Sequence, residues 1–179
     1  ERFLNEVEFT TWNAQHDAGQ TFADGIARQG ERFPHYRPLL QAYSDRFEET
    51  IGEPIAGTVS IARQLRAAGL RTLALTNFSN ETFPRALRLY PFLNEFEGIL
   101  VSGDERLMKP DPAIYELLCS RYGVVPERAV FIDDSLHNVE GARRIGMHAL
   151  QFLTPELLRH DLAALGLHLP GSGESSGRS

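Results

Sequence analysis

The segment AVFIDDSLHN, residues 129–138, joins four apolar residues to two adjacent carboxylates, Asp133 and Asp134. The apolar run is typical of a buried strand, so the two acids mark the point where that strand ends. Two like charges side by side cost energy unless a cation or hydrogen-bond donors lie next to them. The pair therefore indicates either half of a metal site or an accident of the surface.

Outward from this segment, apolar runs alternate with helical segments along most of the chain. The predicted strands cover residues 71–77, 98–103, 128–134 and 147–153, and the predicted helices cover residues 58–69, 81–90, 112–123, 138–146 and 154–166. Such alternation is typical of an α/β fold with a doubly wound parallel, Rossmann-like sheet. The site of such a sheet lies at the carboxyl ends of its strands.

The start of the chain does not follow that alternation. Residues 1–55 carry helical periodicity throughout and predict a separate helical subdomain. Residues 56–170 then form the Rossmann-like core. The tail GSGESSGRS, residues 171–179, has the composition of a linker, and we expect it to be disordered.

Composition excludes several classes of partner. The chain has 179 residues and a net charge of −6 without any basic run, which argues against a nucleic-acid partner. Its apolar stretches are far shorter than a membrane span, so we expect no membrane partner. Cys119 is the only cysteine, which rules out an internal disulfide and predicts a cytoplasmic protein. Oligomeric state is left open.

Polar side chains follow three of the predicted strands. Thr76 and Asn77 end the first, Lys109 lies in the loop after the second, and Asp133 and Asp134 end the third. Because the ends of parallel strands share one edge, we expect these groups to converge. A hydroxyl, an ammonium and two carboxylates suit an oxyanion held beside a hard cation such as Mg²⁺. Taken singly, each has a simpler interpretation, as a turn residue, a solvated lysine or a helix N-cap.

The three motifs together resemble the haloacid dehalogenase-like (HAD) hydrolase superfamily. LALTNFS, LMKPDPAIY and VFIDDSLHNVEGARRIGMHAL look like its second, third and fourth motifs, in order, within residues 56–155. The helical start is similar to the inserted cap of subfamily I, in its sugar-phosphatase-like branch. By this likeness Thr76 and the Asn77 backbone would bind a phosphoryl group, and Lys109 would neutralise it and orient the nucleophile. Asp134 would ligate Mg²⁺, with Asp133 as a further ligand or as a partner behind it.

The resemblance implies Mg²⁺-dependent hydrolysis of a small phosphorylated metabolite through an aspartyl-phosphate. The family's nucleophile is the first Asp of a D-x-D or D-x-G motif that ends a strand before the cap. None of Asp17, Asp24, Asp45, Asp104 and Asp111 follows such a strand. We therefore expect the chain to begin inside the cap, to lack the nucleophile and a central strand, and to be inactive by itself. The absent part would be roughly 30 residues, one βα unit.

Two alternatives stay open. A 2-haloacid dehalogenase, which the family also contains, would need no metal. The adjacent Asp133 and Asp134 speak against it, because dehalogenase-type members carry uncharged polar residues there. A catalytically inactive HAD-like binding module would explain the absent nucleophile. The sequence does not name the substrate.

Overall fold

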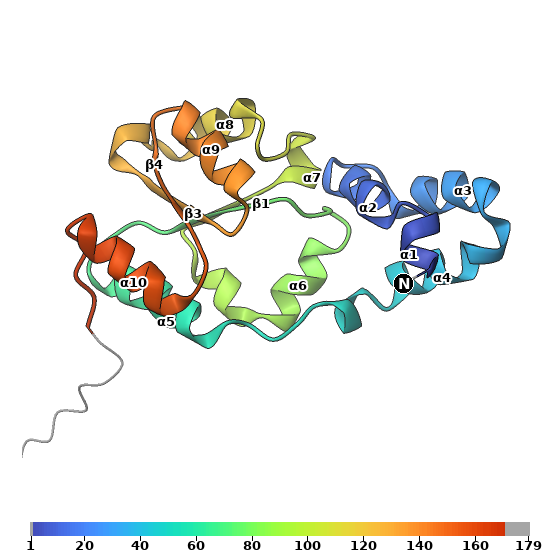
Figure 1. The fold of residues 1–179 in the computed structure, drawn as a ribbon, viewed down its shortest axis with the longest axis horizontal. Coiled ribbons are helices and arrows are strands. Elements are labelled where there is room, and N and C mark those ends of the chain that lie inside the picture. Colours follow the sequence, from blue (N-terminus) through green and yellow to red (C-terminus); the bar gives the residue numbers. More distant parts are fainter. Residues whose placement is uncertain (1, 171–179) are drawn as a thin grey trace, which may run out of the picture.

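The computed structural model describes residues 2–170 and alternates helices with strands from residue 56 onward (Figure 1). The predicted tail, residues 171–179, lies outside the described residues. The helices and strands, in chain order, are α1 (Arg2–Glu6), α2 (Phe9–Asp17), α3 (Phe22–Arg32), α4 (Arg37–Asp45), α5 (Ala56–Ala67), β1 (Leu73–Thr76), α6 (Phe83–Leu89), β2 (Gly98–Val101), α7 (Ser102–Glu105), α8 (Pro112–Tyr122), β3 (Val130–Asp133), α9 (Leu136–Arg144), β4 (His148–Gln151) and α10 (Pro155–Ala164). Short 3₁₀ helices are η1 (Pro34–Tyr36), η2 (Phe47–Thr50), η3 (Pro91–Glu95) and η4 (Pro126–Arg128).

The four strands form two parallel pairs. β1 pairs with β2, so that Thr76 lies opposite Val101, and β3 pairs with β4, so that Asp133 lies opposite Gln151. The predicted α/β fold with parallel strands is confirmed. Within residues 2–170 no ladder of backbone hydrogen bonds joins β1 to β3, so the strands make two separate pairs rather than one continuous sheet.

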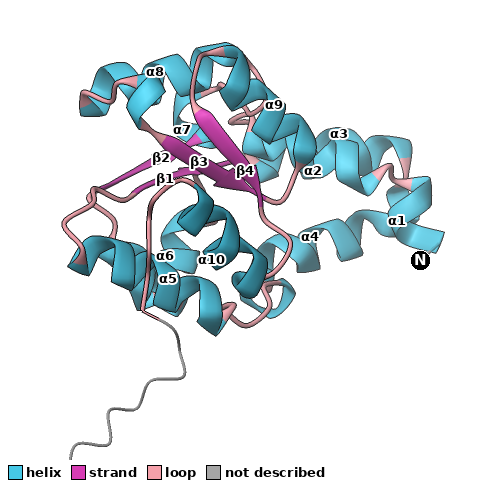
Figure 2. Cartoon of the chain, turned by 60° about the vertical axis from the view of Figure 1, so that its left-hand side comes forward, coloured by secondary structure: helices cyan, strands magenta, loops and turns pink. Residues whose placement is uncertain are grey.

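Helices cover both faces of the strands, as a doubly wound fold requires. Figure 2 shows α8 and α9 on one side of the strands and α5 and α10 on the other. Side chains of β3 alternate between these layers, because successive residues of a strand point to opposite faces. Phe131 packs edge-on against Tyr115 of α8, with ring centroids 5.3 Å apart, whereas Val130 and Ile132 pack around Ile61 of α5.

The helices α1–α4 bury an apolar cluster of their own. Its buried members are Val7, Trp12, Phe22, Ile26 and Leu40. Their hydrophobic faces therefore pack mainly on one another rather than on the strands. The boundary predicted at residue 55 stays a prediction.

Three contacts hold this helical segment against the loops that follow β1 and β2. Arg85 of α6 pairs with Glu48 of η2 and donates to backbone carbonyls at the end of α4. The Ser102 hydroxyl donates to the Asp17 carbonyl, and Phe47 packs on Phe78 with ring centroids 5.6 Å apart. The helical segment thus lies over the strand ends where the polar residues gather.

Candidate active site

Lys109 bridges the two pairs of strands. Its Nζ donates to the carbonyl oxygen of Leu75 in β1, at 2.9 Å, and to Oδ2 of Asp133 in β3, at 2.7 Å. The Lys109 and Asp133 side chains are only 9% and 7% exposed, so the ion pair is buried. The predicted convergence of the strand ends is therefore present, and it centres on this ammonium group.

The two adjacent acids have different surroundings. Both oxygens of Asp133 are occupied: Oδ2 by Lys109, and Oδ1 by the backbone N–H of Ser135 and the side-chain amide of Asn138, each at 2.9 Å. Asp134 is exposed, and its carboxylate makes no hydrogen bond to residues 2–170. Repulsion between the two acids is relieved because Lys109 and two further donors balance the charge of Asp133.

Asn77 holds the Lys109 backbone at two points. Its side-chain Nδ2 donates to the Lys109 carbonyl at 3.0 Å, and its Oδ1 accepts from the Lys109 N–H at 2.9 Å. The sequence assigned Asn77 a role through its backbone, and this positioning role of its side chain was missed. These two hydrogen bonds join the loop after β1 to the loop after β2 that carries Lys109.

Thr76 ends β1 beside these residues. Its side chain is half-buried, and its hydroxyl makes no hydrogen bond within residues 2–170. The carbonyl of the preceding residue, Leu75, accepts from Lys109, and a hydroxyl without a partner at this strand end can donate to an anion that arrives there. The roles predicted for Thr76, Asn77, Lys109, Asp133 and Asp134 towards a ligand stay predictions.

The oxygen ligands available for Mg²⁺ are few. Across residues 2–170, no three His, Cys, Asp or Glu side chains come together as a metal-binding group. Mg²⁺ in phosphate-transfer sites is commonly held by one or two carboxylates, with waters and the substrate phosphate completing its shell. The free carboxylate of Asp134 fits that pattern as one ligand. Asp133 precedes Asp134 in the chain and forms an ion pair with Lys109, so it connects the candidate metal ligand to the lysine.

Within the described residues, the aspartates that were considered as nucleophiles from the sequence make no ion pair with Lys109. Asp133 is the only carboxylate of residues 2–170 in an ion pair with that ammonium, and three donors already hold it. Cys119 lies in the core, where burial raises the pKa of its thiol and keeps it protonated.

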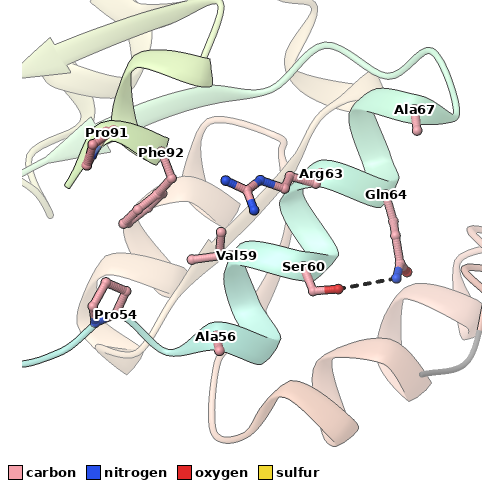
Figure 3. A pocket seen from close by; sticks show the side chains of 9 residues that line it. All are labelled: Pro54, Ala56, Val59, Ser60, Arg63, Gln64, Ala67, Pro91 and Phe92. Carbon is pink, nitrogen blue, oxygen red and sulfur yellow. Dashed lines mark hydrogen bonds between the residues drawn. The ribbon is translucent and has the colours of Figure 1, made fainter. Parts of the chain in front are cut away.

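A first hollow lies away from the strand ends. It measures about 750 Å³ and runs between α5 and η3, with Arg63 and Phe92 on its walls (Figure 3). Arg63 is already paired with Glu95. None of its lining residues belongs to the loops after β1, β2 or β3, so this hollow is not the candidate site.

A smaller cavity adjoins the Lys109 cluster. It measures about 250 Å³ and lies between the helical segment and the loop after β1. Asn77 lines it from the core side, and Asp17 and Tyr43 line it from the helices. A ligand bound at the strand ends could therefore extend into this cavity.

One residue of the site escaped the sequence reasoning. Ser102 is fully buried, accepts from the Phe78 N–H at 2.9 Å and donates to the Asp17 carbonyl. Asn138 also belongs to the site, because its side-chain amide donates to Asp133. The position of Ser102 near the carboxyl end of the predicted strand 98–103 was the one signal that could have identified it.

Comparison with known proteins places the chain in a family. A family model described as haloacid dehalogenase-like hydrolase matches residues 2–146. Acyl-CoA dehydrogenase family member 10 of Mus musculus is 35% identical over 132 residues, which is 72% of this chain and 12% of that protein. Sesquiterpene phosphatase astK of Aspergillus oryzae is 30% identical over 106 residues, 58% of this chain and 54% of that protein. Other matched relatives carry the names of phosphatases and of (S)-2-haloacid dehalogenases.

The solved structures agree on the fold. A HAD family enzyme of Bacteroides thetaiotaomicron, in complex with magnesium and inorganic phosphate, superposes with a TM-score of 0.64 at 19% identity. The match covers 76% of this chain and 72% of that one. The chain spans about half the length, or less, of the curated relatives named above. Among residues 2–170, no helix is both long and apolar enough to cross a membrane.

Proposed function

Since the chain belongs to the haloacid dehalogenase-like hydrolases, we propose that it supplies most of the active site of a Mg²⁺-dependent phosphomonoesterase. The observation that carries this proposal is the buried Lys109–Asp133 pair, which lies at strand ends that also carry the hydroxyl of Thr76 and the exposed carboxylate of Asp134. These groups match the needs of a phosphoryl group: donors for its oxygens and an oxygen ligand for its metal.

Each residue then has a distinct role. Thr76 donates its hydroxyl to a phosphoryl oxygen, with the Asn77 backbone N–H beside it. Lys109 neutralises the phosphoryl charge, and the Asn77 side chain keeps the lysine in position. Asp133 holds the ammonium group of Lys109 in place through a buried ion pair. In nucleophilic substitution at phosphorus, such fixed positive charge stabilises the equatorial oxygens of the transition state.

Asp134 is the residue that we propose as the Mg²⁺ ligand of this chain. The metal, when bound, supplies a second positive charge to the phosphate oxygens. Asp133 is a partner behind that ligand rather than a ligand itself, because its two oxygens already accept from Lys109, Ser135 and Asn138.

The attacking carboxylate belongs to a strand that these residues do not provide. We propose that it lies between β1 and β3, where the two pairs of strands share no backbone ladder. A carboxylate there attacks phosphorus and forms an aspartyl-phosphate, while a second acid of the same strand end protonates the leaving alcohol. Water then hydrolyses the aspartyl-phosphate, which releases phosphate and restores the carboxylate. By itself, the 179-residue chain should therefore give no turnover.

Three further points complete the proposal. The substrate is a small phosphorylated metabolite, as the names of several relatives indicate for those proteins. The helices α1–α4 act as a cap over the site. The cytoplasmic location predicted from the single cysteine stays a prediction.

A 2-haloacid dehalogenase is the second candidate, since two relatives carry that name. The free carboxylate of Asp134 disfavours it, because a dehalogenase of this family needs no metal ligand there. An inactive binding module is the third candidate.

One assay separates the three functions. The chain, and the longest open reading frame that contains it, are incubated with p-nitrophenyl phosphate and Mg²⁺, and with 2-chloropropionate and EDTA. We expect Mg²⁺-dependent release of phosphate from the longer product and none from the 179-residue chain. Chloride release in EDTA would establish the dehalogenase instead. Binding of phosphate esters by both products without turnover of either substrate would establish the binding module.

A further inference from the structure

The cavity of about 250 Å³ beside the Lys109 cluster has a definite chemical character. Phe47 and Phe78 supply aromatic walls, and Asp17, Asn13 and Tyr43 supply polar groups. Its volume lies below the roughly 300–1,000 Å³ of pockets for drug-sized ligands, so it suits a small metabolite.

No cation lines this cavity. None of its lining residues is Lys, Arg or His, and Asp17 is its one ionisable carboxylate. The nearby guanidinium of Arg85 lies over the ring of Phe47 and is already engaged by Glu48 and by the carbonyl of Ser44. An anionic group that enters the cavity therefore meets a carboxylate and finds no counterion, which is unfavourable at low dielectric.

Asp17 is held rigidly in this place. Its carbonyl accepts from the buried hydroxyl of Ser102, so the end of α2 is tied to the end of β2. Two residues further on, Gly19 has a φ of +92°, and a Cβ there would lie 2.7 Å from the carbonyl oxygen of Gly103. This close approach needs glycine. Burial also raises the pKa of Asp17 to about 6, so the group is ionised above that pH.

The other polar groups of the cavity can bond a hydroxylated ligand. Asn13 accepts from the Tyr43 hydroxyl through Oδ1 at 2.9 Å, which leaves its amide N–H groups as donors. Asp17 supplies acceptors. A fixed donor and a fixed acceptor between aromatic rings can orient an uncharged hydroxyl compound.

We propose that this cavity binds the alcohol part of the phosphomonoester. In this proposal Asp17 favours alcohols that carry uncharged hydroxyl groups and disfavours alcohols that carry a carboxylate. The inference rests on the proposed function, because it places the phosphoryl group at Thr76 and Lys109. It goes beyond that function by naming the substrate class: phosphate esters of small uncharged polyols, rather than phosphorylated hydroxy acids.

A matched pair of ligands tests the selection. Glycerol 3-phosphate and 3-phosphoglycerate differ only in a CH₂OH group against a carboxylate. Their dissociation constants are measured by calorimetry with Mg²⁺ at pH 7.5, for the wild-type protein and for Asp17→Asn. Asp24→Asn makes the same chemical change on an exposed position of α3 outside the cavity and is the control. The same preparations are assayed for hydrolysis of p-nitrophenyl phosphate.

We expect the wild type and the control to bind glycerol 3-phosphate at least about ten-fold more tightly than 3-phosphoglycerate. Asp17→Asn should reduce this preference to about two-fold, mainly through tighter binding of 3-phosphoglycerate. Equal affinities in the wild type, or an unchanged preference in Asp17→Asn, would overturn the inference. Failure of both ligands to bind would overturn it as well. The proposed function fails separately, if the product of the longest open reading frame that contains this chain binds phosphate esters with this preference but hydrolyses none of them.

Discussion

Replacing Lys109 by Met should destabilise the protein by about 3 kcal/mol, because the change leaves the Asp133 carboxylate buried without its counterion. The Nζ–Oδ2 distance is 2.7 Å, and the two side chains are 9% and 7% exposed. At an effective dielectric of about 20, the attraction at this distance is about 6 kcal/mol, and the cost of desolvating both ions offsets much of it.

A single substitution removes the attraction but keeps the cost of burying the remaining ion. Such losses are typically about 3–5 kcal/mol. Asp133 keeps two hydrogen bonds, from Ser135 and Asn138, so we expect the lower end of that range. In a protein of this size, that loss lowers the melting temperature by about 6–12 °C.

Urea unfolding followed by circular dichroism measures the effect in Lys109→Met, in Asp133→Asn and in the double variant. The double variant should lose less than the sum of the singles, by at least about 1.5 kcal/mol, because the two residues interact directly. Arg46→Met removes the exposed Arg46–Glu49 pair and should leave the urea midpoint unchanged. Strictly additive losses, or a single variant as stable as the wild type, would refute the reasoning.

Three further predictions concern single residues. The raised pKa of Asp17 means that the folded state disfavours its charge, so stability falls as the pH rises from about 4 to about 6; calorimetry should find Asp17→Asn no more stable than the wild type at pH 4 and more stable at pH 7.5. Gly103→Ala should cost about 1–3 kcal/mol in urea unfolding, because its Cβ would lie 2.8 Å from the Phe78 carbonyl oxygen, whereas Gly52→Ala has open space and should be neutral. Asp134→Asn should weaken Mg²⁺ binding at least about ten-fold by calorimetry without changing the melting temperature, since the side chain is exposed; unaltered Mg²⁺ affinity would contradict the ligand assignment.

Local pattern was sufficient to predict the elements that carry the site. The predicted helix start at Thr154 is confirmed by a side-chain cap that accepts from the backbone N–H of Leu157, three residues on. The predicted helix ends at Gly69 and Gly146 are confirmed by φ values of +82° and +94°. Such signals act within one turn of chain, so the residues themselves contain the information.

The sequence did not reveal which side chains meet. The sequence placed Lys109 and both acids at one edge of the sheet. It did not show that, of the two acids, only Asp133 forms an ion pair with the ammonium group of Lys109. Which of the two acids pairs with Lys109 depends on the strand register and on hydrogen-bond donors in α9. One such donor is Asn138, which lies five residues after Asp133. The contacts of Ser102 and Asn77 likewise join residues 24 to 85 positions apart, and periodicity carries no information on such pairs.

The two hydrogen bonds between the Asn77 side chain and the Lys109 backbone also bear on protein engineering. A chimaera that grafts the loop after β1 from a related enzyme, but keeps the native loop after β2, would separate partners that fit each other. Specificity transplants in this scaffold should therefore exchange both loops as one unit.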